Sequence, residues 1–144
     1  MDNTANLIAK LNFKMQQFII KRLDDQGIRG IVPSHGGILL SLLQYQSLTM
    51  NELAKKISKD PSTVTCLVKK LTALGYTKIT KDMFDKRANR VSLTDKGLEL
   101  VDVIKQVSEK LYQRQYLGFS EDEIAAFRAL VEKMTANFEQ DVTE

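Results

Sequence analysis

Residues 82–97, D-M-F-D-K-R-A-N-R-V-S-L-T-D-K-G, constrain the fold of this chain more than any other segment. Their first half mixes acidic and basic residues, which favours a solvent-exposed turn. Residues 91–93 then alternate apolar and polar side chains, as a short strand does. A second strand at 77–80 would complete a two-stranded hairpin with a charged tip, and Thr94 can cap a following helix.

Length and composition predict a single domain. The chain has 144 residues, of which 43% are hydrophobic, so it can bury a core. Cys66 is the only cysteine and cannot form an internal disulfide, which favours a reducing cytoplasm. We see no signal peptide, and no apolar segment approaches the roughly 20 residues of a membrane span. One histidine and one cysteine argue against a zinc site, and we expect no metal or cofactor.

Charge is distributed unevenly along the chain. The formal net charge is +3, but residues 55–96 contain 11 Lys or Arg and 4 Asp or Glu and so carry +7. The remainder carries −4. A basic middle between acidic flanks indicates one module that binds a polyanion.

Apolar periodicity and capping residues predict six helices beside the hairpin. The first spans about 4–25 and ends before two glycines. Pro33 marks the next boundary, and Ser34 can cap the second helix. After the hairpin a helix of about 95–116 follows, and S-E-D-E at 120–123 is a capping box that opens the last helix.

Two further helices lie in the basic middle of the chain. The capping box T-x-x-E from Thr49 to Glu52 opens a short third helix. Asp60 and Pro61 suit the cap and first position of a fourth helix, which ends at Gly75. Because only a short break joins these helices, they predict a helix-turn-helix over about 49–74, followed by a wing over about 77–94.

The second helix of such a motif lies in the DNA major groove. At about 100° per residue, one side of it is apolar and must face the core. The residues predicted to face DNA from its outward side and flanks are Ser62, Thr63, Thr65, Cys66, Lys69 and Lys70. Lys69 suits a guanine or phosphate, and Thr65 suits a thymine methyl group.

The hairpin offers a second contact surface. Lys86, Arg87 and Arg90 bring positive charge near its tip, where an arginine can enter a narrow minor groove. Asp85 lies two residues before Arg87 and can hold its side chain in place. The alternative is a solvated turn with local ion pairs, which explains the charges but not their position beside a helix-turn-helix.

The motifs D-x-x-D-K-R-A-N-R-V-S-L-T-D-K-G and N-E-L-A-K-K-I-S-K-D-P-S-T-V-T-C-L-V-K-K-L closely resemble those of the MarR family of transcriptional regulators. The resemblance covers nearly the whole chain and implies a mainly α fold with a small β-hairpin wing. It implies an obligate dimer, joined through terminal helices at about 4–25 and 95–141, on a pseudo-palindromic operator. It also implies a small phenolic or anionic effector bound where the winged head meets the dimerisation helices.

Two residues leave alternatives open. Cys66 faces outward near two lysines, so it is either a reactive thiolate whose oxidation releases DNA or a small side chain against a base. A basic residue often stands at this position in the family. His35 precedes two glycines in an early helical turn and is either a wall residue of the effector pocket or a surface or capping histidine.

Enzymatic function is not expected, because a lone histidine without a Gly-rich loop or nucleophile elbow supports no usual catalytic site. We predict a cytoplasmic, dimeric, sequence-specific DNA-binding repressor that a small molecule releases. The alternatives are a winged-helix module that binds protein, and a DNA binder without an effector.

Overall fold

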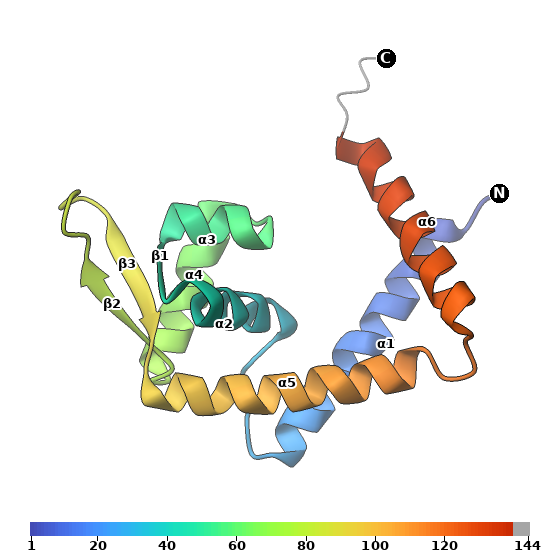
Figure 1. Ribbon diagram of the computed structural model, residues 1–144, viewed down its shortest axis with the longest axis horizontal. Coiled ribbons are helices and arrows are strands. Elements are labelled where there is room, and N and C mark those ends of the chain that lie inside the picture. Colours follow the sequence, from blue (N-terminus) through green and yellow to red (C-terminus); the bar gives the residue numbers. More distant parts are fainter. Residues whose placement is uncertain (140–144) are drawn as a thin grey trace. The chain divides into compact units, whose positions relative to one another are not determined.

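The structure is a computed structural model that describes residues 1–139. Helices dominate it, and a small sheet forms the wing, so the predicted fold class is confirmed (Figure 1). Positions 140 and 141 of the predicted terminal segment lie outside the described residues. The elements in chain order are α1 (Thr4–Asp25), α2 (Pro33–Tyr45), β1 (Ser47–Thr49), α3 (Met50–Ile57), α4 (Pro61–Ala73), β2 (Thr77–Lys81), β3 (Asn89–Leu93), α5 (Asp95–Gln115) and α6 (Glu121–Glu139).

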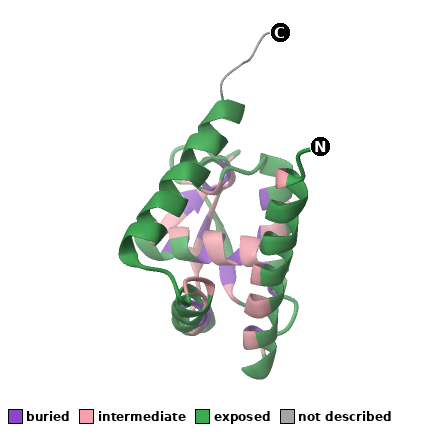
Figure 2. Ribbon diagram, turned by 90° about the vertical axis from the view of Figure 1, so that its right-hand side faces the viewer, coloured by how far each residue is buried: buried purple, intermediate pink, exposed green. Residues whose placement is uncertain are grey.

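The chain forms two compact units, of which the first is Met1–Leu111 and the second begins at Tyr112. The first unit has an apolar core, whose buried residues are purple in Figure 2. It is enclosed by α2, α3, α4, the sheet and most of α5. The side chains of this core with essentially no exposed surface are Ile38, Leu39, Leu53, Val64, Val68, Leu71 and Val91. The winged head therefore has an apolar core of its own within one chain.

The sheet has three antiparallel strands in the order β1-β3-β2. Val91 of β3 lies opposite Leu48 on one side and Ile79 on the other. The predicted two-stranded hairpin is present as β2 and β3, but β1 was not predicted, because three residues beside a helix cap carry no measurable periodicity. This short strand ties the wing to the start of α3.

Local hydrogen bonds fix the helix-turn-helix as the sequence predicted. The hydroxyl of Thr49 accepts the Glu52 N–H at 3.2 Å, and the carboxylate of Asp60 accepts the Thr63 N–H at 2.8 Å. At the end of α4, Gly75 has φ +86°, a left-handed conformation that glycine adopts without strain. The N–H groups of Gly75 and the next residue then bond back to the last turn of α4, at 3.0 and 2.9 Å.

The glycine that ends the wing motif is required by a close backbone approach. The Thr94 hydroxyl caps α5 by accepting the Gly97 N–H at 3.1 Å. A Cβ atom at Gly97 would lie 2.1 Å from the carbonyl oxygen of Tyr76, well inside van der Waals contact. The end of the wing can therefore pack on the turn after α4 only if position 97 has no side chain.

The start of α2 differs from the prediction. Pro33 is the first helical residue, so Val32 takes the capping position and Ser34 lies inside the first turn. The Val32 N–H donates to Nδ1 of His35 at 3.0 Å. Ser34 is therefore not the capping residue, and the His35 imidazole instead bonds back from the first turn to the backbone of Val32.

The terminal helices leave their apolar residues uncovered within the described chain. Of α1 only Leu23 is buried, and of α6 no residue is buried. In the second unit, Ser120 and Glu123 form the predicted reciprocal capping box, with hydrogen bonds of 3.0 and 3.1 Å. Over residues 1–139, no helix combines the length and the apolar character needed to cross a membrane.

Candidate nucleic-acid interface

Helix α4 separates its apolar and polar faces as predicted. Val64, Val68 and Leu71 are fully buried in the head. Of the residues predicted to face DNA, Thr65 is half-buried, and the exposed ones are Ser62, Thr63, Cys66, Lys69 and Lys70. Most of this outward surface consists of short side chains, over which a nucleic-acid backbone can approach closely.

Hydrogen bonds hold the first turn of α4 in one arrangement. The carboxylate of Asp60 accepts both the Thr63 N–H and the Ser62 hydroxyl, each at 2.8 Å. The Thr63 backbone bond is the main reason that the pKa of Asp60 lies below its ordinary value. The Thr65 hydroxyl donates to the Pro61 carbonyl at 2.8 Å. Since their protons are used internally, Ser62 and Thr65 present acceptor oxygens to a ligand.

The two lysines of α4 differ in their surroundings. A Cβ atom at Gly30 would lie 3.3 Å from both Cε and Nζ of Lys70, so this side chain reaches back to the loop between α1 and α2. Lys69 is exposed on the outward face of α4. Lys69 is thus the better placed of the two for a phosphate or a base.

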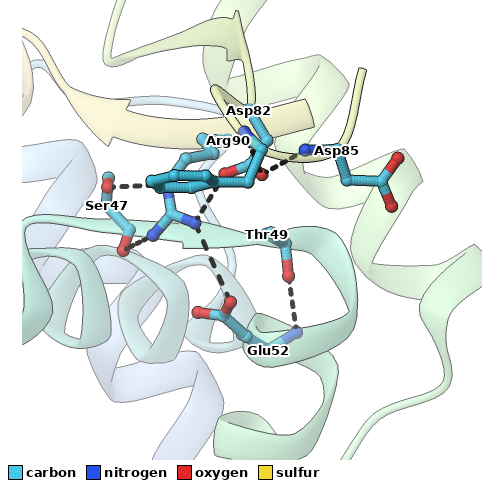
Figure 3. Close-up of polar contacts among 7 residues, drawn as sticks. Ser47, Thr49, Glu52, Asp82, Asp85 and Arg90 are labelled. Atoms are coloured by element: carbon cyan, nitrogen blue, oxygen red, sulfur yellow. Dashed lines mark hydrogen bonds and ion pairs between the residues drawn. The ribbon is translucent and has the colours of Figure 1, made fainter. Parts of the chain in front are cut away.

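Arg90 holds the base of the wing (Figure 3). Its guanidinium donates to the hydroxyl and the carbonyl of Ser47, both at 3.0 Å, and to the Asp82 carboxylate at 3.1 Å. Glu52 of α3 lies 3.9 Å from the same group. The Arg90 side chain is only 31% exposed. It was predicted to contact DNA from near the tip, but the unpredicted strand β1 supplies acceptors that draw it inward.

Asp82 closes the wing tip. Its carboxylate accepts the N–H groups of Phe84 and Asp85, at 3.2 and 2.9 Å, in addition to the Arg90 bond. The Asp85 N–H, followed by the Arg90 side chain, holds the pKa of Asp82 below its ordinary value. Neither Asp82 nor Ser47 was given a role from the sequence, although the first aspartate of the wing motif was a signal for Asp82.

Arg87 lies almost fully exposed at the tip of the wing. Its side chain is 98% exposed. Asp85 Oδ1 accepts the Arg87 N–H at 3.0 Å but lies 3.9 Å from the guanidinium, so it supports the backbone more than the side chain. Lys86 is exposed beside them. A groove joins this tip to the start of α3 and is lined by Thr49, Met50, Asn51, Arg87, Ala88 and Asn89.

His35 is buried, with 2% of its surface exposed, so it is a capping histidine but not a surface one. Because Nδ1 accepts a backbone N–H, the neutral ring carries its proton on Nε2, which has no hydrogen-bond partner among the described residues. Burial, and then the charge of Lys70, lowers the pKa of His35 from its ordinary value of 6.5. The ring is therefore neutral at pH 7.

An apolar cleft of about 130 Å³ lies in the first unit between α1, α2 and α5. His35, for which a pocket-wall role was one alternative, is not among its lining residues. The two glycines that follow it, Gly36 and Gly37, do line the cleft. They also allow close packing, because Cβ atoms there would lie 3.8 Å from Ile104 and 3.4 Å from Ile57.

Comparison with known proteins assigns a class to this interface. No protein-family model matches the chain. The HTH-type transcriptional repressor MdtR of Bacillus subtilis (strain 168) is 27% identical over 147 residues, which cover 98% of this chain and 94% of MdtR. Its relatives are thus transcriptional regulators and not enzymes.

Solved structures share the fold. The S. aureus MepR–DNA complex matches with a TM-score of 0.85 and 24% identity, over 95% of this chain and 99% of that one. A mutant MarR from E. coli complexed with operator DNA matches with a TM-score of 0.81 and 24% identity, over 90% and 91%. Bordetella bronchiseptica BpsR, solved to explain regulation of its DNA binding by 6-hydroxynicotinic acid, matches with a TM-score of 0.79 and 20% identity, over 93% and 99%.

The fold is that of the winged helix-turn-helix proteins. The chain's curated relatives are HTH-type transcriptional regulators, and its fold and wing motif resemble those of the MarR family.

Proposed function

We propose that this protein is a homodimeric repressor that binds a pseudo-palindromic operator and leaves it when a small molecule binds. The outward face of α4 enters the major groove, with Ser62, Thr63, Thr65, Cys66 and Lys69 facing bases and phosphates. The wing tip carries Arg87 and Lys86 to the adjacent minor groove. Arg90, held by hydrogen bonds to Ser47 and Asp82, positions the wing, and Lys70, exposed near the loop at Gly30, adds positive charge to this face.

The observation that carries this proposal is the exposure of Arg87 beside a polar, short-chained helix face. An arginine that has no strong internal partner is attracted by the negative potential of a narrow minor groove. The +7 charge of residues 55–96 supports the same partner, because neutralised phosphates release counterions.

Dimerisation is supported by the terminal helices. Large apolar side chains of α1 and α6 remain exposed, a state that soluble chains usually avoid by association. The most exposed of them are Leu7, Phe13, Leu130 and Phe138. A symmetric dimer is the commonest way to cover such faces, and its two recognition helices would meet two half-sites one helical turn apart.

The apolar cleft suits a small effector. Its volume of about 130 Å³ is close to the roughly 150 Å³ of an apolar cavity that holds benzene, so one aromatic ring fits. Its only lining side chain with a hydroxyl group is that of Ser108. This chemistry favours a phenolic compound over a strongly anionic one.

Fluorescence anisotropy with a labelled duplex from upstream of the protein's own gene tests the DNA-binding proposal. We expect affinity to fall with salt, with a slope near −0.9 per phosphate neutralised. Lys69→Ala should weaken binding and make the slope shallower, whereas Lys105→Ala, an equal charge change on the exposed side of α5, should not. The absence of binding at low salt would favour a protein-binding module instead.

Sedimentation and a ligand panel test the other two parts. Analytical ultracentrifugation should give twice the monomer mass, and Leu130→Glu should reduce it. Phenolic compounds that weaken the anisotropy signal should lose this effect in Gly36→Val, whose side chain would point towards Ile104 in the lining of the cleft. If the dimer binds DNA and no compound of the panel weakens that binding, the effector part of the proposal is wrong and the DNA-binding part stands.

A further inference from the structure

The wing tip exposes two large apolar side chains between its charged residues. Phe84 is 96% exposed and Met83 is 88% exposed. Apart from the N-terminal methionine, these are the highest exposed fractions of any large apolar side chain over residues 1–139. Charged turns do not need such residues, and they gain nothing from them in water.

The backbone that presents these side chains is closed on itself. The Asp82 carboxylate accepts the Phe84 N–H at 3.2 Å and is held from below by Arg90 at 3.1 Å. The Asp82 N–H donates to the Ala88 carbonyl at 3.0 Å, and the Ala88 N–H donates to the Asp85 carbonyl at 3.0 Å. The tip is therefore preorganised, which lowers the entropy lost when it inserts into a partner.

The neighbouring charge identifies the partner. The side chain of Arg87, three residues after Phe84, is almost fully exposed. The tip is joined by a groove to the start of α3, in the same head as the outward face of α4. An apolar surface beside a free arginine matches the minor groove, whose deoxyribose walls are apolar and whose floor attracts positive charge.

We propose that Met83 and Phe84 form an apolar wedge that enters the minor groove of the bound duplex and partly unstacks one base step. Minor-groove proteins use Phe and Met in this way, and the inserted side chain kinks the duplex. Flexible pyrimidine–purine steps deform most easily, so the wedge adds a preference for such a step where the wing meets DNA. The inference rests on the DNA binding proposed above and adds a residue-level account of what the wing reads.

The double variant Met83→Ser, Phe84→Ser tests the wedge in the full-length protein. Both residues are exposed, so its thermal unfolding should match that of the wild type. Its affinity for the upstream duplex should fall by roughly tenfold. The salt slope should remain unchanged, because the variant keeps every charged group that can neutralise a phosphate. The matched variant Met83→Leu, Phe84→Leu keeps the apolar surface and should retain most of the affinity.

Permanganate oxidation of unstacked thymines provides an independent readout. Wild-type protein should create a reactive thymine at the edge of its footprint, and the serine variant should abolish that reactivity. Equal affinity and equal reactivity of both proteins would overturn the wedge while leaving DNA binding intact. Binding to anionic vesicles by the wild type alone, with equal DNA affinity, would overturn it in favour of a membrane contact. A wild-type protein that binds no duplex at low salt would overturn both proposals.

Discussion

The base and the tip of the wing each contain an arginine, and the two are used in opposite ways. At the base, Arg90 makes three hydrogen bonds to Ser47 and Asp82. At the tip, Arg87 has only a long contact to Asp85 and is otherwise in solvent. The arginine at the base therefore binds partners within the chain, whereas the exposed arginine at the tip is available to bind another molecule.

This contrast shows that a basic motif does not identify its own contact residues. Lys86, Arg87 and Arg90 all add to the positive charge of the hairpin. What separates them is strand β1, which places a hydroxyl and a carbonyl within reach of position 90. Substitutions at the base should act first on folding, and substitutions at the tip should act only on binding.

The largest effect is expected where the base of the wing meets α5. Gly97→Ala would place a Cβ atom against the Tyr76 carbonyl, so the backbone must shift. We expect the free energy of unfolding to fall by about 2–3 kcal/mol in urea titration. Gly36→Ala is the control, because its Cβ would lie at an ordinary 3.8 Å from Ile104. Equal stability of both variants would show that the turn after α4 yields easily.

Arg90→Ala should have the next largest effect and tests the base directly. Loss of its charged hydrogen bonds should cost about 1.5–3 kcal/mol of stability and release the tip. The N–H groups of Phe84 and Asp85 donate to the Asp82 carboxylate, so their hydrogen exchange should become faster in this variant. Arg90→Lys keeps the charge without the bidentate geometry and should be intermediate. Unchanged exchange at these amides would break the contrast between base and tip.

Arg87→Ala should leave stability within about 0.5 kcal/mol of wild type, because its side chain is almost fully exposed. Its effect should appear in DNA binding, as lower affinity and a salt slope shallower by about 0.9 for each phosphate that Arg87 neutralises. Urea titration and anisotropy on the same preparations measure both. An Arg87→Ala protein that is destabilised but binds normally would reverse the assignment of the two arginines.

The smallest expected effect is on the pKa of His35, which should respond to Lys70 but not to the neighbouring Lys69. NMR titration of the only histidine should give a pKa below 6.5, because burial and then Lys70 disfavour the charged ring. Lys70→Ala should raise that pKa part of the way, since burial remains, whereas Lys69→Ala should leave it unchanged. Equal shifts in both variants would place Lys69 and Lys70 in the same environment.

Stability should follow the same titration. The folded pKa of His35 is lowered, so near and below pH 6.5 the unfolded chain binds more protons than the folded one. The contribution of His35 to stability is complete above pH 6.5 and is lost as pH falls towards the folded pKa. His35→Gln should remove this part of the pH dependence in urea titrations between pH 7.5 and 5.5. Parallel curves for the two proteins would contradict a buried, neutral ring.

Local signals made most of the fold predictable. The caps at Thr49, Asp60 and Ser120 and the turn at Gly75 lie where the sequence placed them, because each depends on residues within one helical turn. The apolar face of α4 followed from its periodicity. Contacts between distant residues could not be predicted in this way.

The contacts that the sequence did not show share that physical reason. Arg90 bonds to Ser47 across 43 positions, and Lys70 reaches the loop at Gly30, so neither partner was visible to periodicity or spacing. The sequence left His35 open as a pocket-wall, surface or capping residue, because its bond to the Val32 N–H and its burial depend on the folded chain. The separation of the buried and exposed sides of α4 followed from its periodicity alone.

The most direct test of DNA binding by α4 uses Cys66, the only thiol of the chain, which is exposed on the outward face of that helix. Its alkylation rate by a maleimide is measured with and without saturating upstream duplex, binding being followed by anisotropy in the same sample. We predict that the duplex slows alkylation strongly and that protein alkylated beforehand binds weakly. Alkylation at the same rate in the fully bound complex would contradict the placement of α4 in the groove.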